Sequence, residues 1–541
     1  MTDTPEYRED KFLSENKILL ISYAVIFILM LPIILLRDFT PNNELRYLSI
    51  ADEALRNGNW FSFYNHGIPY ADKPPLYFWI IMVGKKLFGY HLPFFLMLFS
   101  IIPAFITMHI MNKWTRNEMP ADCRFMAKMQ LGATGMFIIC TVLLRMDMLM
   151  CMFIVLSLYT FYEIYAGKSS KFDEWLLPLY IFLGVFTKGP IGILIPVLSI
   201  LSFLIYKKQS KQISKFFGLK SLIVWVVCFG FWFLNVYIEA DSSYLNNLLF
   251  NQTINRGFDA FHHKEPFYYY LGTMWYIFAP WVIFYLIAIF TGIRRKVFDS
   301  DKDRLFITII VVSFLLLSVI SSKLDIYMLP LIPFVAYLSA KAAFKSEHST
   351  ILTWGMLITA LLFIVIFSAA IIFYDKFAAL IPLSDYLYKY IVIASAIPVV
   401  SGIIAIIIFY KRKTVTHSCI VLSLGLLLCM SVLGTQIDNI NQFIGYKKAA
   451  EKAKKLSSSS TELSYMHYGL SEGENIDVYV GKPVPLANRD EILADRLEGC
   501  ILFIKKKSVD RDIELGQYLR DKQIYEVGNI YVIHLETENK K

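Results

Sequence analysis

The sequence predicts a polytopic α-helical membrane protein with a small α/β domain at its carboxyl end. Of the 541 residues, 56% are apolar and 16% are aromatic, well above the levels of soluble proteins. The apolar residues form long continuous runs, and the charged residues gather between them. Runs of this kind indicate spanning helices, because short alternating strands would be needed for a barrel. The hydrophobicity falls after residue 434, so we expect a transmembrane domain at 1–434 and a separate domain at 435–541.

Apolar runs of about 17 to 24 residues predict about thirteen membrane-spanning helices. The first run follows a polar, acidic segment and lacks a small-residue cleavage site, so we expect an uncleaved span rather than a signal peptide. The runs lie near residues 17–36, 92–112, 127–142, 148–165, 174–187, 189–206, 221–239, 268–292, 305–320, 328–343, 352–374, 388–410 and 417–434.

The lysines and arginines predict the orientation of these helices. Cations are concentrated in six loops of one parity, at 113–128, 168–171, 207–220, 294–296, 341–345 and 411–413. By the positive-inside rule these loops face the cytoplasm. We therefore expect a cytoplasmic amino terminus and a carboxyl-terminal domain outside the membrane. The net charge of +9 comes largely from these loops, so it does not indicate a nucleic-acid partner.

The first outer loop, residues 37–91, is far more polar than the runs that flank it. Apolar residues recur at helical spacing over 45–55, which predicts a helix that lies in the membrane interface and ends at Asn57-Gly58. A second apolar piece at 76–88 follows two prolines and is short for a span. We expect this piece to re-enter the membrane or to lie flat on it.

The carboxyl-terminal domain is predicted to alternate strands with helices. It shows no P-loop, no GxGxxG and no GxSxG, so we expect a lid or docking role. The seven cysteines of the chain show no CxxC spacing and are interpreted as small core residues. The expected strands lie at 462–465, 476–480, 500–505 and 530–535, and the expected helices at 445–455 and 511–522.

Ionisable residues gather on the predicted outer side, where the positive-inside rule predicts few cations. Any one of them could simply anchor the chain or snorkel to the interface. Together, outward-facing lysines and arginines indicate an anionic ligand, and phosphate is the natural candidate. The charged residues are Glu44, Arg46, Asp72, Lys73, Arg145, Asp147, Lys188 and Lys323, and the polar residues Asn43 and Tyr327 belong to the same set.

A long outer loop at 240–266 adds a further arginine, Arg256, and the histidine pair His262 and His263. Two histidines with a carboxylate could bind a divalent metal such as Zn, Mg or Mn. Solvated loop histidines without a ligand are the alternative interpretation.

Four motifs together resemble a known family. In chain order they are Glu44-x-Arg46-Tyr47, Asp72-Lys73-Pro74-Pro75-Leu76, Thr187-Lys188-Gly189 and Lys323-Leu324-x-x-Tyr327-x-x-Pro330. The chain resembles the lipid A aminoarabinose transferases, which are close to the protein O-mannosyltransferases. Both belong to the membrane-embedded glycosyltransferases of the GT-C fold, and the resemblance covers the whole chain.

The resemblance implies a function for the outer site. The donor would be a sugar on undecaprenyl phosphate, transferred by a monomer at the outer face of the bacterial inner membrane. It implies that Arg46, Lys73 and Tyr327, with Lys323 beside them, hold the donor phosphate. It further implies roles for Asp147 and Lys188 as a second acidic and basic pair, for Lys188 and Arg256 in the acceptor cavity, and for Asp72 with His262 or His263 as metal contacts.

The chain departs from the family at Asn43, where the family usually has aspartate. Asparagine cannot act as a general base, so either Glu44 or Asp147 takes that role or the acceptor is a phosphate that needs none. We expect transfer by in-line displacement with inversion, to a lipid A-like glycolipid or to a protein Ser or Thr. The alternatives are a transporter or flippase for lipid-linked sugars, or an O-antigen polymerase or ligase.

Overall fold

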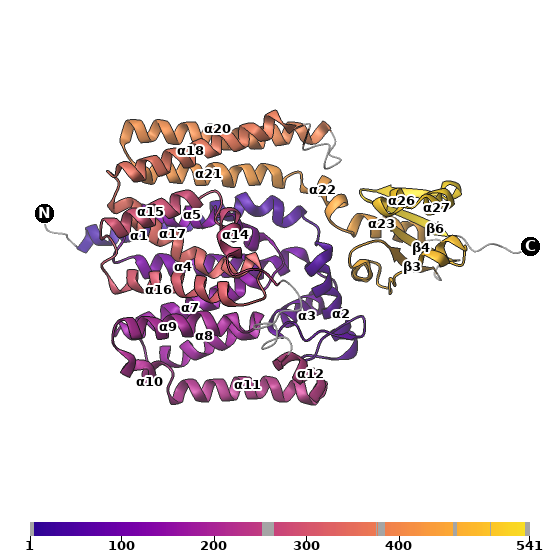
Figure 1. The fold of residues 1–541 in the computed structure, drawn as a ribbon, viewed down its shortest axis with the longest axis horizontal. Coiled ribbons are helices and arrows are strands. Elements are labelled where there is room, and N and C mark those ends of the chain that lie inside the picture. The colour runs from indigo at the N-terminus through magenta and orange to yellow at the C-terminus, as the bar shows by residue number, and fades with distance from the viewer. Residues whose placement is uncertain are drawn as a thin grey trace, which may run out of the picture. The chain divides into compact units, whose positions relative to one another are not determined.

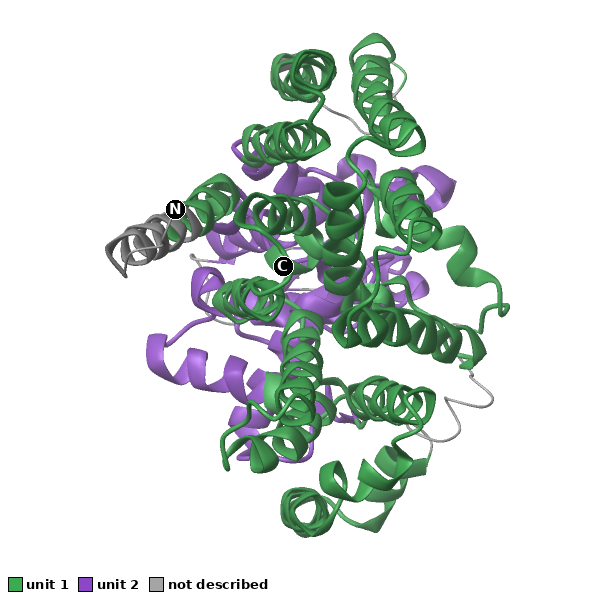
Figure 2. Ribbon diagram, turned by 90° about the vertical axis from the view of Figure 1, so that its left-hand side faces the viewer, with its two compact units in different colours: residues 1–32, 71–77, 97–434 green, residues 33–70, 78–96, 435–541 purple. Residues whose placement is uncertain are grey.

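The computed structural model describes residues 5–250, 264–374, 376, 385–457, 463–497 and 499–535. The chain divides into two compact units, coloured separately in Figure 2. The first unit comprises Met1–Pro32, Ala71–Tyr77 and Met97–Gly434. The second comprises Ile33–Tyr70, Phe78–Leu96 and Thr435–Lys541, so most of the first outer loop groups with the carboxyl-terminal segment.

The first unit consists mainly of the helices that the apolar runs predict (Figure 1). Short helices η2 (Ser210–Gln212), α10 (Ile213–Phe216) and α12 (Ser242–Asn246) lie between longer ones. The long helices are α1 (Pro5–Leu36), α4 (Pro93–Thr115), α7 (Asp147–Tyr165), α8 (Asp173–Lys188), α9 (Ile191–Tyr206), α11 (Leu219–Glu239), α16 (Asp301–Val319), α17 (Ile332–Lys345), α18 (Thr350–Ile372), α20 (Asp385–Arg412) and α21 (Val415–Gly434).

Two predicted spans are broken rather than continuous. The run at 127–142 forms α5 (Ala121–Gly132) and α6 (Gly135–Val142) at 66°, and the run at 268–292 forms α14 (Tyr269–Ile277) and α15 (Val282–Arg294) at 108°. Backbone groups at each break form hydrogen bonds to the segment that contains the other break. The Gly135 amide donates to the Ala279 carbonyl (2.7 Å), and the Trp281 indole donates to the Ala133 carbonyl (3.3 Å). Such pairing is required where a helix is broken inside a membrane.

The described helices identify a multi-pass membrane protein. Seven are long and apolar enough to cross a membrane, and three bent pairs raise the number to ten. The other three predicted spans are present as α8, α9 and α16. The first two have only 16 residues each, and α16 begins with a run of charged residues.

In the second unit, α2 (Arg46–Asn57) ends as predicted at Gly58, whose φ of 78° is a conformation that glycine adopts readily. Its apolar residues Ile50 and Ala54 are almost completely buried, and the helix contacts α24 (Asp477–Val480). The apolar face that we expected against the membrane is therefore covered by protein. The unit also contains the hairpin of β1 (Tyr64–Asn65) and β2 (Ile68–Pro69) and most of α3 (Leu76–Phe88).

A four-stranded sheet forms the centre of the carboxyl-terminal segment, in the order β3-β4-β6-β5. Figure 1 labels β3, β4 and β6 of this sheet. The strand β3 (Ser464–Tyr468) is parallel to β4 (Cys500–Lys505), and β6 (Ile530–Leu535) pairs antiparallel with both β4 and β5 (Ile524–Val527). The sequence predicted β3, β4 and β6 but not the short, partly exposed β5.

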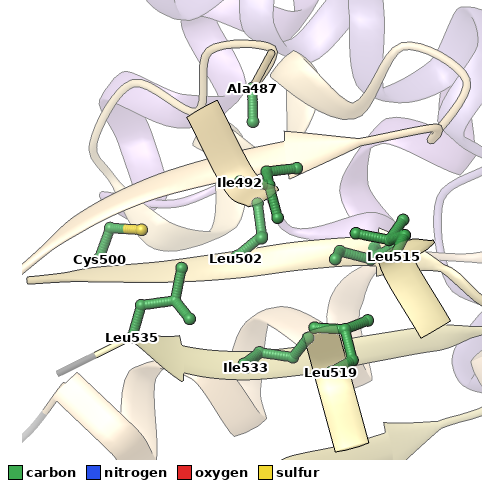
Figure 3. Packing of buried hydrophobic residues seen from close by; sticks show 9 residues of the cluster. Ala487, Ile492, Cys500, Leu502, Leu515, Leu519, Ile533 and Leu535 are labelled. Atoms are coloured by element: carbon green, nitrogen blue, oxygen red, sulfur yellow. The ribbon is translucent and has the colours of Figure 1, made fainter. Parts of the chain in front are cut away.

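Helices cover the sheet. Figure 3 shows Leu502, Ile533 and Leu535 of the strands packed against Ile492 of α25 (Arg489–Leu493) and Leu515 of α27 (Ile513–Tyr518). Alanines of α23 (Lys447–Ser457), which contacts β6 and β4, are also buried. The remaining short helices are α22 (Ile437–Ile444), α26 (Lys506–Arg511) and η6 (Leu519–Asp521).

One expected strand, at 476–480, is wrong. These residues form the end of η5 (Gly473–Ile476) and the helix α24, which stops at Gly481 with φ 75°. The apolar residues Ile476, Val478 and Val480 alternate as in a strand, but the preceding turn at Glu472 and the left-handed Gly481 are helix boundary signals.

Candidate functional site: a cationic cavity beside apolar walls

Lys188 lies at a tight connection between two helices of the first unit. α8 ends at this residue, Gly189 has φ 99°, and Pro190 precedes α9. The two helices approach closely because Gly192 has no side chain: a Cβ there would lie 2.2 Å from a backbone carbon of Gly184. The connection therefore fixes Lys188 at the end of two packed helices, and its side chain is only 5% exposed.

Asp147 is the partner of this lysine. It begins α7, forms an ion pair with Lys188, and accepts a hydrogen bond from Nε of Arg145 (3.2 Å). The Asp147 side chain is 2% exposed, so its charge depends on these two cations. The structure thus brings together the acidic and basic pair that the resemblance implied.

Tyr327 and Lys323 come from the segment before α17. The Lys188 ammonium lies 4.9 Å from the centroid of the Tyr327 ring, which belongs to η4 (Asp325–Leu331). Lys323 instead donates to the backbone carbonyls of Ile320 (2.6 Å) and Glu265 (2.9 Å). The ammonium of Lys323 therefore holds the backbone of this turn, and its expected contact with the donor phosphate remains a prediction.

Asp72 and Lys73 form an ion pair of 2.6 Å directly before the two prolines that precede α3. Asp72 was expected to contact a metal together with His262 or His263. Both histidines, and Arg256, lie outside the described residues. Among the residues that are described, no group of three histidine, cysteine or carboxylate side chains could hold a metal ion.

A cavity of about 680 Å³ in the first unit is bordered by several of these residues. Its polar lining consists of Asp72, Lys73, Lys188, Ser321, Ser322 and Tyr327. Most of the remaining lining is apolar and comes from α8, α9, α11 and α16, with Phe229, Trp232 and Phe233 as the aromatic members. Neither Asp147 nor Lys323 borders the cavity. The cavity therefore combines cations with an extensive apolar wall, which suits an amphiphilic anion.

Glu44, in the second unit, accepts hydrogen bonds at both carboxylate oxygens. Both of its oxygens accept hydrogen bonds from Arg37 (2.7 Å each), and Thr40 donates from its amide (2.7 Å) and its hydroxyl (2.9 Å). The neighbouring Asn43 has φ 79° and ψ −64°, which is uncommon for a residue with a side chain. The sequence analysis did not single out Arg37, because a cation directly after a span has no distinguishing pattern.

Arg46 is held by a residue of the carboxyl-terminal domain. Its Nε and Nη2 donate to Glu472 at 3.0 and 2.6 Å. Burial raises the pKa of Glu472, although Arg46 acts in the opposite direction. Sequence analysis expected no chemistry in this domain and missed Glu472, because the two partners lie 426 positions apart.

Comparisons with known proteins identify relatives of this chain. A family model described as dolichyl-phosphate-mannose-protein mannosyltransferase matches residues 72–233. A solved structure with a similar fold is ArnT from Cupriavidus metallidurans bound to undecaprenyl phosphate, with TM-score 0.75, 15% identity and coverage of 96% of this chain and 98% of that one. The chain therefore has the GT-C fold of membrane glycosyltransferases.

Curated relatives align over part of their length. The undecaprenyl phosphate-alpha-4-amino-4-deoxy-L-arabinose arabinosyl transferase of Edwardsiella ictaluri is 24% identical over 55% of this chain and 54% of its own. An uncharacterized protein of Aquifex aeolicus is 26% identical over 63% of this chain and 67% of its own. The chain thus matches about half to two thirds of the length of these relatives.

Proposed function

We propose that the protein is a glycosyltransferase that moves a sugar from a polyprenyl monophosphate to an acceptor at the outer face of the bacterial inner membrane. The observation that carries this proposal is the cavity in which Lys73, Lys188 and Tyr327 border apolar walls. A polyprenyl phosphate has both matching parts, an anionic head and an apolar chain. The printed descriptions of the relatives, which name undecaprenyl phosphate, support the same donor class.

The charges around the cavity favour an anion. Among the described residues, Lys73 pairs with Asp72, and both Lys188 and Arg145 pair with Asp147. These cations would attract a phosphate group and would stabilise the charge that grows on it as the sugar departs.

The proposed reaction is an in-line displacement at the anomeric carbon of the donor sugar. An acceptor oxygen forms the new bond to this carbon while the bond to the phosphate oxygen breaks, and the electron pair leaves with the polyprenyl monophosphate. Lys73 and Lys188 supply positive charge to the leaving phosphate, and the Tyr327 hydroxyl donates to it. The contact of Arg46 with a donor phosphate, which the resemblance implies, remains a prediction.

The ion pairs of Glu44 and Asp147 indicate which chemical class of acceptor the enzyme uses. A hydroxyl acceptor must lose its proton to a base, whereas a phosphate acceptor is already ionised. Glu44 is bonded to Arg37 and Asp147 to Lys188, so both expected bases are occupied by cations. We therefore favour a phosphate group of a lipid A-like glycolipid as the acceptor. A protein hydroxyl is the second candidate, favoured by the match to the mannosyltransferase family model.

The expected divalent metal remains a prediction. Lys73 pairs with Asp72, the expected metal contact, and the expected histidines lie outside the described residues. No step of the reaction is assigned to a metal.

The test is donor cleavage by the purified full-length protein. Undecaprenyl phosphate carrying aminoarabinose or a hexose would be supplied with either a phosphorylated glycolipid or a Ser/Thr peptide, and released undecaprenyl phosphate would be measured. We expect release that requires an acceptor, with the glycolipid preferred. Movement of intact donor across vesicles without cleavage would instead indicate a flippase.

A further inference from the structure

The turn after β3 in the carboxyl-terminal domain holds two neighbouring parts of the first outer loop. Ser471 donates through its hydroxyl to the side chain of Asn42 (3.0 Å), and Glu472 accepts from Arg46. The Tyr446 hydroxyl fixes this turn by donating to the carbonyl of Ser471 (2.7 Å). The turn therefore contacts the outer loop on both sides of Asn43, within the second unit.

Glu472 has an uncommon backbone conformation and a second hydrogen-bond partner. Its φ of 52° and ψ of 42° are left-handed, a region that residues with a side chain seldom occupy. The Asn475 amide donates to Oε2 of Glu472 (3.2 Å), so the carboxylate is bonded on two sides. A surface ion pair would require neither feature.

Glu472 occupies only one edge of the Arg46 guanidinium group. Glu472 takes Nε and one N–H of Nη2, which are the donors on one edge of the planar guanidinium. Among the described residues, Nη1 of Arg46 makes no hydrogen bond, and the side chain is 27% exposed. The end of the guanidinium formed by Nη1 and Nη2 therefore still presents donors, in the arrangement that binds phosphate through two hydrogen bonds.

We propose that Glu472 is a positioning residue, which fixes the plane of Arg46 so that its remaining edge binds a phosphate group of a lipid-linked substrate. This inference rests on the proposed function and deepens it, because it gives the carboxyl-terminal domain a part in substrate binding. Glu472 does not touch the substrate. It acts by restricting the rotation of a long, flexible side chain before the ligand arrives.

The test is a double-mutant cycle on the binding of undecaprenyl phosphate to the full-length protein in detergent. Arg46→Ala should weaken binding strongly, and Glu472→Gln should weaken it about tenfold, the loss expected when one partner of a charge-assisted contact is removed. In the Arg46→Ala background, Glu472→Gln should have no further effect. Glu472→Asp should restore part of the affinity, and in turnover assays Glu472→Gln should raise KM for the donor more than it lowers kcat.

A matched control comes from the same domain. Glu514 also pairs with an arginine, Arg489, but is mostly exposed, and Glu514→Gln should leave binding unchanged. Two results would overturn the inference: an equal loss from Glu472→Gln with and without Arg46, or tighter binding by Glu472→Gln, which would mean that Glu472 competes with the phosphate. Absence of binding by the wild-type protein would instead overturn the proposed function itself.

Discussion

Two lysines of the first unit form ion pairs in which their side chains are buried, yet their surroundings differ. Lys188 pairs with one carboxylate, Asp147, which it shares with Arg145, and it borders the cavity. Lys341 of α17 donates to both oxygens of Asp303 (2.7 Å each) and to Glu118 (2.7 Å). Glu118 also pairs with Lys302 (3.0 Å), and the Lys302 ammonium donates to the carbonyl of Trp114 (2.6 Å).

The difference lies in the charge balance. The cluster around Lys341 has as many cations as carboxylates, and it lies among helix ends without bordering the cavity. In the described part of the chain, the cluster around Lys188 has two cations, Lys188 and Arg145, on one carboxylate, Asp147, and Lys188 borders the cavity. A buried ion pair is weak evidence of stabilisation in itself, but removing one partner of a balanced cluster leaves an uncompensated charge. We therefore infer a structural role for Lys341 and a ligand-binding role for Lys188 and Lys73.

The largest effect is expected from Lys341→Met. Asp303 and Glu118 would lose a shared cation, which should lower the free energy of unfolding by about 3 to 5 kcal/mol. Thermal unfolding in detergent measures this, with Lys345→Met at the exposed end of the same helix as the control. If Lys341→Met folded normally but lost turnover, the structural assignment would fail.

Lys73→Ala should lower the rate of turnover and leave the thermal stability unchanged. Losing one charge-assisted contact to a developing anion typically costs roughly 3 kcal/mol, on the order of a hundredfold in rate, while the thermal stability stays near that of the wild type. Turnover of the lipid-linked donor measures the loss, and Lys220→Ala, at an exposed ion pair with Glu174, is the matched control. Normal turnover in Lys73→Ala would mean that this lysine only anchors the chain.

Glu44→Gln tests whether Glu44, in the second unit, stabilises the fold or takes part in the reaction. Its carboxylate is buried and accepts from Arg37 and Thr40, so the amide should cost about 1 to 3 kcal/mol of stability. The rate per folded molecule should change only slightly. A hundredfold fall in kcat without loss of stability would identify Glu44 as a general base and would favour a hydroxyl acceptor.

The smallest effect on stability is expected from Asp512, which forms an ion pair with the partly exposed Arg489. Arg489 and the Leu515 amide lower the pKa of Asp512 to about 2, below its usual value of 3.8. The ionised form therefore favours folding above about pH 4, and this contribution disappears as the pH falls toward 2. Asp512→Asn should lower the Tm slightly at pH 7, and the difference from wild type should vanish near pH 2. A difference that did not change with pH would exclude the ionised carboxylate as its cause.

Much of the fold could be predicted because membrane helices have a strong sequence signal. The run at 76–88 and the strands at 500–505 and 530–535 have the predicted bounds. Lys188 could be singled out because a lysine between two spans is unusual on the outer side. Its pairing with Asp147 was implied by the family resemblance, and the structure brings the two side chains together.

The other contacts depend on packing that local patterns do not encode. Glu472 meets Arg46 only after the carboxyl-terminal domain folds against the outer loop, and nothing near Glu472 marks it as a partner. The loops' lysines were interpreted together as topology signals, so the buried position of Lys341 could not be anticipated. The bend between α5 and α6 likewise depends on bonds to the α14–α15 segment.

Photocrosslinking of the lipid tests the central claim most directly. Undecaprenyl phosphate with a diazirine near its head group would be bound to the full-length protein, irradiated, and the labelled peptides identified. We predict labelling of the cavity segments at 71–74, 185–194 and 229–233, reduced by excess unlabelled lipid phosphate and by Lys73→Ala. Labelling confined to exposed helix faces such as that of α18, unaffected by competitor, would contradict a polyprenyl phosphate site in this cavity.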